Sequence, residues 1–233
     1  ARVAPAIAAA LEAADSLRAP WRCAAADGPT LADETLTAGS RTWKLGGRTV
    51  KLEGSGAVTI GVIADAGGAA PPTIAALGAL RGKLAGADLV VALGGMGTTQ
   101  AELEATLGAL ADRAKWPLVA VPGDLEHAGA QAAAIAALRT RGQLVIDGRL
   151  ARMVELPGAT IATVAGALAE SRLVAGADGC GYRVADATAA IAALTSRPGL
   201  RILASAEAPR QMVGGEPTGE LALTAGATQE IDI

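Results

Sequence analysis

Residues Asp88 to His127 have the sequence DLVVALGGMGTTQAELEATLGALADRAKWPLVAVPGDLEH, and this stretch decides the fold. It begins with a short apolar run, Asp88 to Leu93, in which two valines are adjacent. A continuous apolar run of this length is typical of a strand that is covered on both faces. Three glycines, Gly94, Gly95 and Gly97, end the run, so a tight turn follows the strand.

A helix and a second strand follow this turn. Thr99 and Glu102 have the spacing of a capping box, and leucines recur behind them at helical spacing. The second apolar run, Pro117 to Val121, is again typical of a buried strand. A helix between two such strands predicts a parallel pair with a right-handed crossover. Because the carboxyl ends of both strands then meet at one edge of the sheet, we expect any binding site there.

Composition excludes several classes of function. The chain has 233 residues, a formal net charge of -3, a sequence pI near 5.3 and only 2% aromatic residues. Nucleic-acid-binding surfaces need basic side chains and, for single strands, stacking rings, so we expect no nucleic-acid partner. The longest apolar windows are interrupted by acidic residues or glycines and are too short for a membrane span. Phe is absent, so the core must be built from Leu, Val, Ile and Ala.

The two cysteines, Cys23 and Cys180, lie far apart and lack the spacing of a metal-binding pair. They are compatible with one disulfide bond in an oxidising compartment or with two buried thiols. Both lie in loop-like surroundings, which favours the disulfide. A bonded pair would favour a periplasmic or extracellular location, and the sequence otherwise leaves the compartment open.

Residues 1–56 are predicted to form an N-terminal extension. Arg2 to Arg18 has the apolar spacing of a helix. Cys23 to Ser40 is rich in Gly, Pro, Asp and Thr and is expected to be an irregular connector. Arg41 to Leu52 alternates side chains around a Gly-Gly pair and is predicted to be a β-hairpin. Residues 57–233 then form the main α/β domain.

The main domain starts with the same strand-helix order and then changes it. A strand from Ala57 to Asp65 and a helix from Pro72 to Leu84 form another parallel unit with the strand at Asp88. Later strands follow one another without helices, which indicates a mixed sheet or a second sheet. The remaining expected elements are a helix from His127 to Arg139, strands Gln143–Asp147, Arg152–Leu156 and Thr160–Val164, a helix Ala185–Thr195, and strands Leu200–Ala204 and Glu220–Thr224.

Five of these strands end in short motifs that occur in a recognisable order. The motifs are Asp65-Ala66-Gly67, Gly94-Gly95, Gly123-Asp124-Leu125-Glu126, Ser205-Ala206-Glu207-Ala208-Pro209 and Gly226-Ala227-Thr228-Gln229. In order and setting they resemble the D-x-H, G-D, G-N-H-D/E, S-H-x-P and G-H-x-H motifs of the calcineurin-like metallophosphoesterase family. This resemblance implies a layered α/β/β/α sandwich of mixed sheets flanked by helices.

The resemblance also implies where two catalytic metal ions would lie, and there the residue types differ. The family has metal ligands or a catalytic acid at the positions that here carry Gly67, Gly95, Leu125, Ala206, Ala227 and Gln229. Only Asp65 keeps its identity as a ligand. Small and apolar side chains cannot hold the cations that would activate water. We therefore expect no metal cofactor and no phosphoesterase activity, but a structural or protein-interaction component of an assembly.

Two alternatives use the same edge of the sheet. Leu93 to Thr98, LGGMGT, also resembles the G-G-D-G-T loop of NAD kinase-like and lipid kinase-like proteins, with Met96 in place of the Asp. Free N–H groups at the helix start after Thr98 and Thr99 would suit a small ligand, a nucleotide or a phosphate. In the other alternative, acidic residues and the single histidine form the mononuclear metal site of a residual phosphoesterase. The candidate ligand-binding residues are Asp65, Gly94, Gly95, Asp124, Glu126 and His127.

A plainer interpretation accounts for the same residues. Asp65 and Asp124 can cap turns, and His127 can start the next helix. A metal site also needs more converging ligands than this set offers. The sequence leaves these interpretations open.

Overall fold

The computed structural model describes residues 22–24, 28–168, 173–174 and 178–207, and the backbone of 211–213 and 216–218. Its helices are α2 (Pro71–Lys83), α3 (Gln100–Ala111), α4 (Ala128–Thr140) and α5 (Val184–Thr195). Its strands are β1 (Leu31–Ala38), β2 (Arg41–Gly47), β3 (Thr49–Leu52), β4 (Ile60–Ala64), β5 (Leu89–Leu93), β6 (Leu118–Val121), β7 (Val145–Asp147), β8 (Met153–Leu156), β9 (Ala159–Val164), β10 (Leu200–Ser205), β11 (Gln211–Val213) and β12 (Glu216–Thr218).

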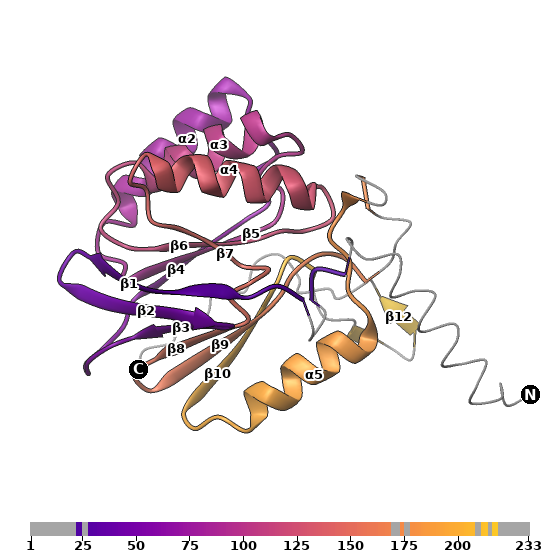
Figure 1. Cartoon of the computed structure of the whole chain (residues 1–233). Helices are drawn as coiled ribbons and strands as arrows, with labels where there is room; N and C mark the ends of the chain where they lie inside the picture. Colours follow the sequence, from indigo (N-terminus) through magenta and orange to yellow (C-terminus); the bar gives the residue numbers. More distant parts are fainter. Residues whose placement is uncertain are drawn as a thin grey trace, which may run out of the picture.

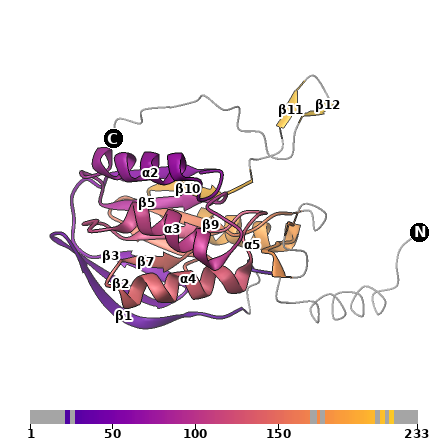
Figure 2. The ribbon, with the colours of Figure 1, turned by 90° about the horizontal axis from the view of Figure 1, so that it is seen from above.

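The described residues form an α/β protein in which two sheets are stacked between helices (Figure 1). Helices α2, α3 and α4 form one outer layer, and a four-stranded sheet lies beneath them. A six-stranded sheet forms the next layer, and α5 covers part of its far face. Figure 2 shows the three helices side by side over the four-stranded sheet.

The four-stranded sheet has the order β4-β5-β6-β7, and all its pairs are parallel. Each helix of the outer layer connects two neighbouring strands, as the crossovers expected from the sequence require. The capping box predicted for α3 is present, with Thr99 as its N-cap and Glu102 as its partner. The carboxyl ends of β4, β5 and β6 therefore meet at one edge.

The six-stranded sheet has the order β1-β2-β3-β8-β9-β10 and is mixed. Its β3-β8 and β9-β10 pairs are parallel, and its other pairs are antiparallel. The expected hairpin is formed by β2 and β3. Strands β1 to β3, from the predicted N-terminal extension, are hydrogen-bonded into the same sheet as β8 to β10. Of the two stacked sheets only this one is mixed in the described residues, whereas the sequence resemblance implied two mixed sheets.

One expectation for the N-terminal part is wrong. The sequence predicts an irregular connector from Cys23 to Ser40, yet residues 31–38 within it form β1, an edge strand paired with β2. Only Leu36 and Ala38 of this strand are buried, and the polar residues Asp33, Glu34 and Thr35 are exposed. A strand with so short an apolar face gives almost no alternation in the sequence, which is why composition favoured a loop.

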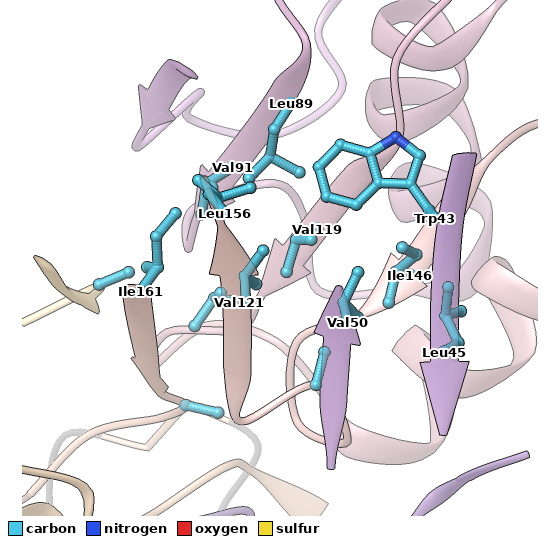
Figure 3. Packing of buried hydrophobic residues seen from close by; sticks show 14 of the residues in the cluster. Trp43, Leu45, Val50, Leu89, Val91, Val119, Val121, Ile146, Leu156 and Ile161 are labelled. Atoms are coloured by element: carbon cyan, nitrogen blue, oxygen red, sulfur yellow. The ribbon is translucent and has the colours of Figure 1, made fainter. Parts of the chain in front are cut away.

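The main core lies between the two sheets (Figure 3). Trp43, Leu45 and Val50 come from the six-stranded sheet, and Leu89, Val91 and Val119 face them from the four-stranded sheet. Trp43 is fully buried and is the largest side chain in this layer. A second cluster joins the four-stranded sheet to the helices through Leu103, Leu107, Leu110 and Leu138. The expected core of aliphatic side chains is thus present, with Trp43 added to it.

Several sequence predictions lie outside the described residues. They are the helix at 2–18, the strand at 220–224, the residues Ala208 and Pro209, and the motif at 226–229. None of the helices in the described part of the chain is long and apolar enough to cross a membrane.

Candidate functional site

The candidate residues follow three parallel strands at the edge where ligands bind in α/β proteins. Asp65 follows β4, Gly94 and Gly95 follow β5, and the turn that contains Asp124 follows β6. The chain after β10 reaches the same place from the other sheet, because Ala206 lies against Gly94 and Gly123. Four of the five motifs that the sequence analysis names are therefore neighbours in space, and the fifth, at 226–229, lies outside the described residues.

These turns pack so closely that glycine is required. A Cβ atom added to Gly94 would lie 2.9 Å from the Ala206 Cβ and 3.1 Å from the Gly123 Cα. A Cβ added to Gly123 would lie 3.1 Å from the same Ala206 Cβ. Gly94 also has a φ of 56°, which favours glycine. The ends of β5, β6 and β10 are thus in van der Waals contact.

Asp65 and Gly95 form a second close contact at this edge. Gly95 has a φ of 67°, and a Cβ added to it would lie 2.5 Å from Asp65 Oδ1 and 2.7 Å from the Asp65 Cα. Asp65 itself is exposed and has a φ of 50°, a backbone conformation that Asp tolerates better than most residues. Its backbone N–H donates to the carbonyls of Leu93 and Gly94, so Asp65 continues the pairing of β4 with β5.

The side chain of Glu126 points inward and binds backbone groups of two turns. Its Oε1 accepts a hydrogen bond from the Met96 N–H at 2.7 Å, and its Oε2 accepts one from the Gly123 N–H at 2.8 Å. Glu126 is 1% exposed. Burial raises the pKa of the Glu126 carboxyl above its ordinary value, and the two N–H groups offset only part of that effect. This carboxylate joins the end of β5 to the end of β6.

A second carboxylate binds the other end of the glycine turn. Glu102 Oε2 accepts hydrogen bonds from the backbone N–H groups of Thr98 at 2.9 Å and Thr99 at 3.1 Å, and from the Thr98 hydroxyl at 2.8 Å. The Thr98 N–H and hydroxyl hold the pKa of Glu102 below its ordinary value. The free N–H groups expected from the sequence belong to the helix start after Thr98 and Thr99, and the N–H groups of Thr98 and Thr99 themselves are not free. Both are bound by a side chain of the same helix.

Asp124 and His127 lie farther out in the turn after β6. Both are half-buried. The Asp124 carbonyl accepts a hydrogen bond from the Val174 N–H at 3.0 Å. His127 is the N-cap residue of α4, and its side chain makes no capping hydrogen bond. The two residues have the turn and helix-start positions that the plainer interpretation assigned to them.

The turn at His127 is paired with the chain next to the disulfide bond. Cys23 and Cys180 are bonded, with their Cα atoms 5.2 Å apart. His127 pairs with Gly179 in an isolated antiparallel bridge, and the Cys23 N–H donates to the Gly181 carbonyl at 3.0 Å. The bond therefore attaches the N-terminal segment to the chain that borders the candidate site.

The sequence did not assign a site role to Glu207, although it occurs in one of the motifs. It is buried, and its Oε2 accepts hydrogen bonds from the Leu168 N–H and the Tyr182 hydroxyl, each at 2.8 Å. Glu207 thus links the end of β10 to Leu168 and to Tyr182, which lie before and after the disulfide-bonded Cys180 in the sequence. An acidic residue within the otherwise small and apolar Ser205-Ala206-Glu207-Ala208 was the only signal for it.

The described residues do not fit a pair of metal ions. Gly95 stands where the family that the sequence resembles has a bridging carboxylate, and Asp65 fills the space that a side chain there would need. Glu126 directs both oxygens to backbone N–H groups. Among the residues that the structure describes, no three His, Cys, Asp or Glu side chains are grouped as a metal site requires. The described part of the chain therefore offers no donor set for two-metal chemistry.

Comparison of the chain with protein-family models, with curated proteins and with solved structures found no match in any of the three.

Proposed function

We propose that this chain is a metallophosphoesterase-like domain without metal-dependent chemistry, and that it serves as a structural or protein-interaction component of an assembly. The observation that carries the proposal is the pair of hydrogen bonds from Met96 and Gly123 to the buried Glu126 carboxylate. A carboxylate that is held in this way cannot turn outward to a cation without leaving two buried N–H groups unpaired. Glu126, the most deeply buried of the candidate acids, therefore stabilises the fold by binding the backbone of two turns.

The surface of α5 supports the interaction part of the proposal. This helix has the sequence VADATAAIAALT, in which Asp186 is the only charged residue and is buried. Val184 and Ile191 are exposed on it, at 66% and 45%. An exposed helix face without charge is typical of a surface that contacts another protein.

The small-ligand alternative has less support. A phosphate at the start of α3 would lie beside the Glu102 carboxylate, which already binds the N–H groups of Thr98 and Thr99, and the Glu102 N–H itself donates to the Thr99 hydroxyl. Phosphate or a nucleotide would have to displace this carboxylate. We therefore expect phosphate, ATP and NAD to leave the melting temperature unchanged, and a ligand-dependent rise would favour the small-ligand alternative.

The catalytic part of the proposal is tested with metal and substrate together. The chain is purified with Mn²⁺, Zn²⁺ or Fe²⁺ supplied, its bound metal is measured, and phosphomonoesters and phosphodiesters are assayed. We expect bound metal well below one ion per chain and no turnover. Stoichiometric metal with turnover that Asp65→Ala abolishes would overturn the proposal.

The interaction part needs its own measurement. In extracts of the source cells, the chain should elute at a size larger than a monomer, and Ile191→Asp should shift it to the monomer position. Thr195→Asp, on the same helix, is the control for added charge at a polar exposed position. A monomeric wild-type chain in such extracts would refute an assembly role.

A further inference from the structure

We propose that a hollow on the far face of the six-stranded sheet, beside the end of α5, binds a small aliphatic monocarboxylate. The hollow has a volume of about 320 Å³, and its polar side chains are Lys51, Glu155, Thr160 and Arg197. Small-ligand sites occupy roughly 300–1,000 Å³. The candidate site follows the carboxyl ends of its strands, whereas this hollow borders the beginnings of β9 and β10. The proposal is therefore independent of the proposed function.

A row of polar side chains crosses the sheet in this hollow. The strand register places Lys51 of β3 opposite Glu155 of β8, and Glu155 opposite Thr160 of β9. Val50 and Ile161, the chain neighbours of Lys51 and Thr160, point into the core between the two sheets, as Figure 3 shows. Because side chains alternate along a strand, the row points to the far face. All three of its members line the hollow.

The chain after α5 adds a fourth polar side chain. Arg197 forms an ion pair with Glu155, with 2.9 Å between Nη1 and Oε1. This pair neutralises the one carboxylate that the described residues contribute to the lining. The Arg197 carbonyl accepts a hydrogen bond from the Arg201 Nε at 2.8 Å, which fixes the turn above the row. The hollow therefore has a defined wall as well as a floor.

Lys51 leaves one positive charge in the lining without a counter-ion. Its side chain is exposed, and the described residues form no ion pair with it. Lys44, which lies opposite Lys51 on β2, is in contrast paired with Glu53. A concave surface with one excess positive charge attracts an anion, and a single excess charge suits a monoanion.

Thr160 supplies a second donor. It is only 5% exposed, and its hydroxyl forms no hydrogen bond with the described residues. Buried polar groups normally have a partner. Two strand spacings of about 4.8 Å each separate Lys51 from Thr160, a gap that the four-carbon stem of lysine and one ligand can bridge. A carboxylate has two oxygens and can accept from the ammonium and the hydroxyl together.

The rest of the lining suits a short hydrocarbon chain. It consists mainly of two turns, Pro157-Gly158-Ala159 and Pro198-Gly199. A Cβ atom added to Gly199 would lie 2.3 Å from the Gly158 carbonyl oxygen, so the two turns are in contact. Apolar walls with a few polar groups are typical of small-molecule sites. Inorganic phosphate has no apolar part and fits this lining less well.

The test is a titration of the full chain with butyrate, followed by the backbone amide shifts in NMR spectra. Butyramide has the same hydrocarbon chain without the charge, and sodium chloride at equal ionic strength controls for salt. We expect saturable shifts at Gly158, Thr160 and Gly199 with butyrate, and none with butyramide, sodium chloride or inorganic phosphate. Shifts that do not saturate, or that butyramide or phosphate reproduces, would overturn the proposal.

Two substitutions locate the bound carboxylate. Lys51→Gln should raise the Kd of butyrate about tenfold or more, because the charged donor is lost. Thr160→Val keeps the shape of the side chain and should raise the Kd about fivefold. Lys44→Gln is the matched control, one strand outside the hollow, and should change the Kd by less than about twofold. The spectra without butyrate show whether each variant is folded. Binding that survives both Lys51→Gln and Thr160→Val would place butyrate elsewhere, which also overturns the proposal.

Discussion

Glu126 and Glu102 bind opposite ends of the same glycine turn, yet the pKa values of their carboxyl groups are shifted in opposite directions. Glu126 accepts hydrogen bonds from the N–H groups of Met96 and Gly123, and Glu102 from those of Thr98 and Thr99. The pKa of Glu126 is nevertheless raised, whereas the pKa of Glu102 is lowered. Each carboxylate accepts hydrogen bonds from two backbone N–H groups, and Glu102 accepts one more from the Thr98 hydroxyl. The pKa values differ in direction mainly because Glu126 is buried.

Burial is the main cause of that difference. Glu126 lies under the turns after β5 and β6, where water is excluded and the charged form is disfavoured. Glu102 caps a helix near the surface, where the N–H groups and the helix dipole stabilise its charge at little desolvation cost. The turn therefore has a buried anchor at one end and a helix cap at the other. Both acids accept hydrogen bonds from backbone N–H groups of this turn.

The largest expected effect comes from adding a third carboxylate to this turn. Gly95→Asp should lower the free energy of unfolding by roughly 3 kcal/mol or more, because its Cβ would overlap the Asp65 backbone. Gly67→Asp is the matched control. Gly67 has a similar φ of 74° but no neighbour within 4 Å, so only the left-handed strain of about 1 kcal/mol remains. Urea unfolding of both variants measures the difference. Equal losses of the free energy of unfolding would show that Gly95 is not packed against Asp65.

Glu126→Gln should have the next largest effect, about 2 kcal/mol, because an amide NH₂ would face one of the two buried N–H groups. The effect should depend on pH. A raised folded-state pKa gives stability that is present below the ordinary value of 4.5 and is lost as pH rises through the folded-state value. The loss caused by Glu126→Gln should therefore shrink as pH rises from 4 to 7 in urea-unfolding measurements. A loss that grows with pH would contradict the raised pKa.

Glu102→Gln should have a smaller effect with the opposite pH trend. The amide oxygen can still accept from Thr98 and Thr99, so only the charge at the helix start is lost, which is worth about 1 kcal/mol or less. A lowered folded-state pKa gives stability that is present above 4.5 and is lost as pH falls through the folded-state value. The loss should be full at pH 7 and vanish at low pH in the same urea series. Parallel pH trends for the two variants would refute the contrast between buried anchor and helix cap.

The sequence predicted the elements around this turn because their signals are local. The apolar run of β5, the capping box of α3 and the apolar run of β6 each lie within a few residues of chain. Short apolar runs on either side of a helix also determine that the strands are parallel. These features depend on nearest neighbours in the chain, so the residue types suffice.

The role of Glu126 could not be predicted in the same way. One of its two donors, the Met96 N–H, is 30 residues away, and a backbone donor has no residue type to recognise. The need for glycine at positions 94 and 123 could not be predicted either, because it comes from contact with Ala206, which follows a strand of the other sheet. Sequence motifs located these positions correctly as neighbours of one edge. Their packing is a tertiary property, and it decides whether the edge is open or filled.

Substitution of Asp65 should have the smallest effect on the free energy of unfolding, because its carboxylate, unlike those of Glu126 and Glu102, binds no backbone N–H group of the described residues. It is exposed, and the described residues form no hydrogen bond to its carboxylate oxygens. Asp65→Asn keeps a residue that tolerates the φ of 50° and removes only the charge, so the free energy of unfolding should change by about 0.5 kcal/mol or less. Asp65→Ala should be worse by about 1 kcal/mol, because alanine is strained in the left-handed region. If urea unfolding shows that Asn is as costly as Ala, the charge itself stabilises the fold, and Asp65 then belongs with Glu126 and Glu102 as a carboxylate that holds this edge together.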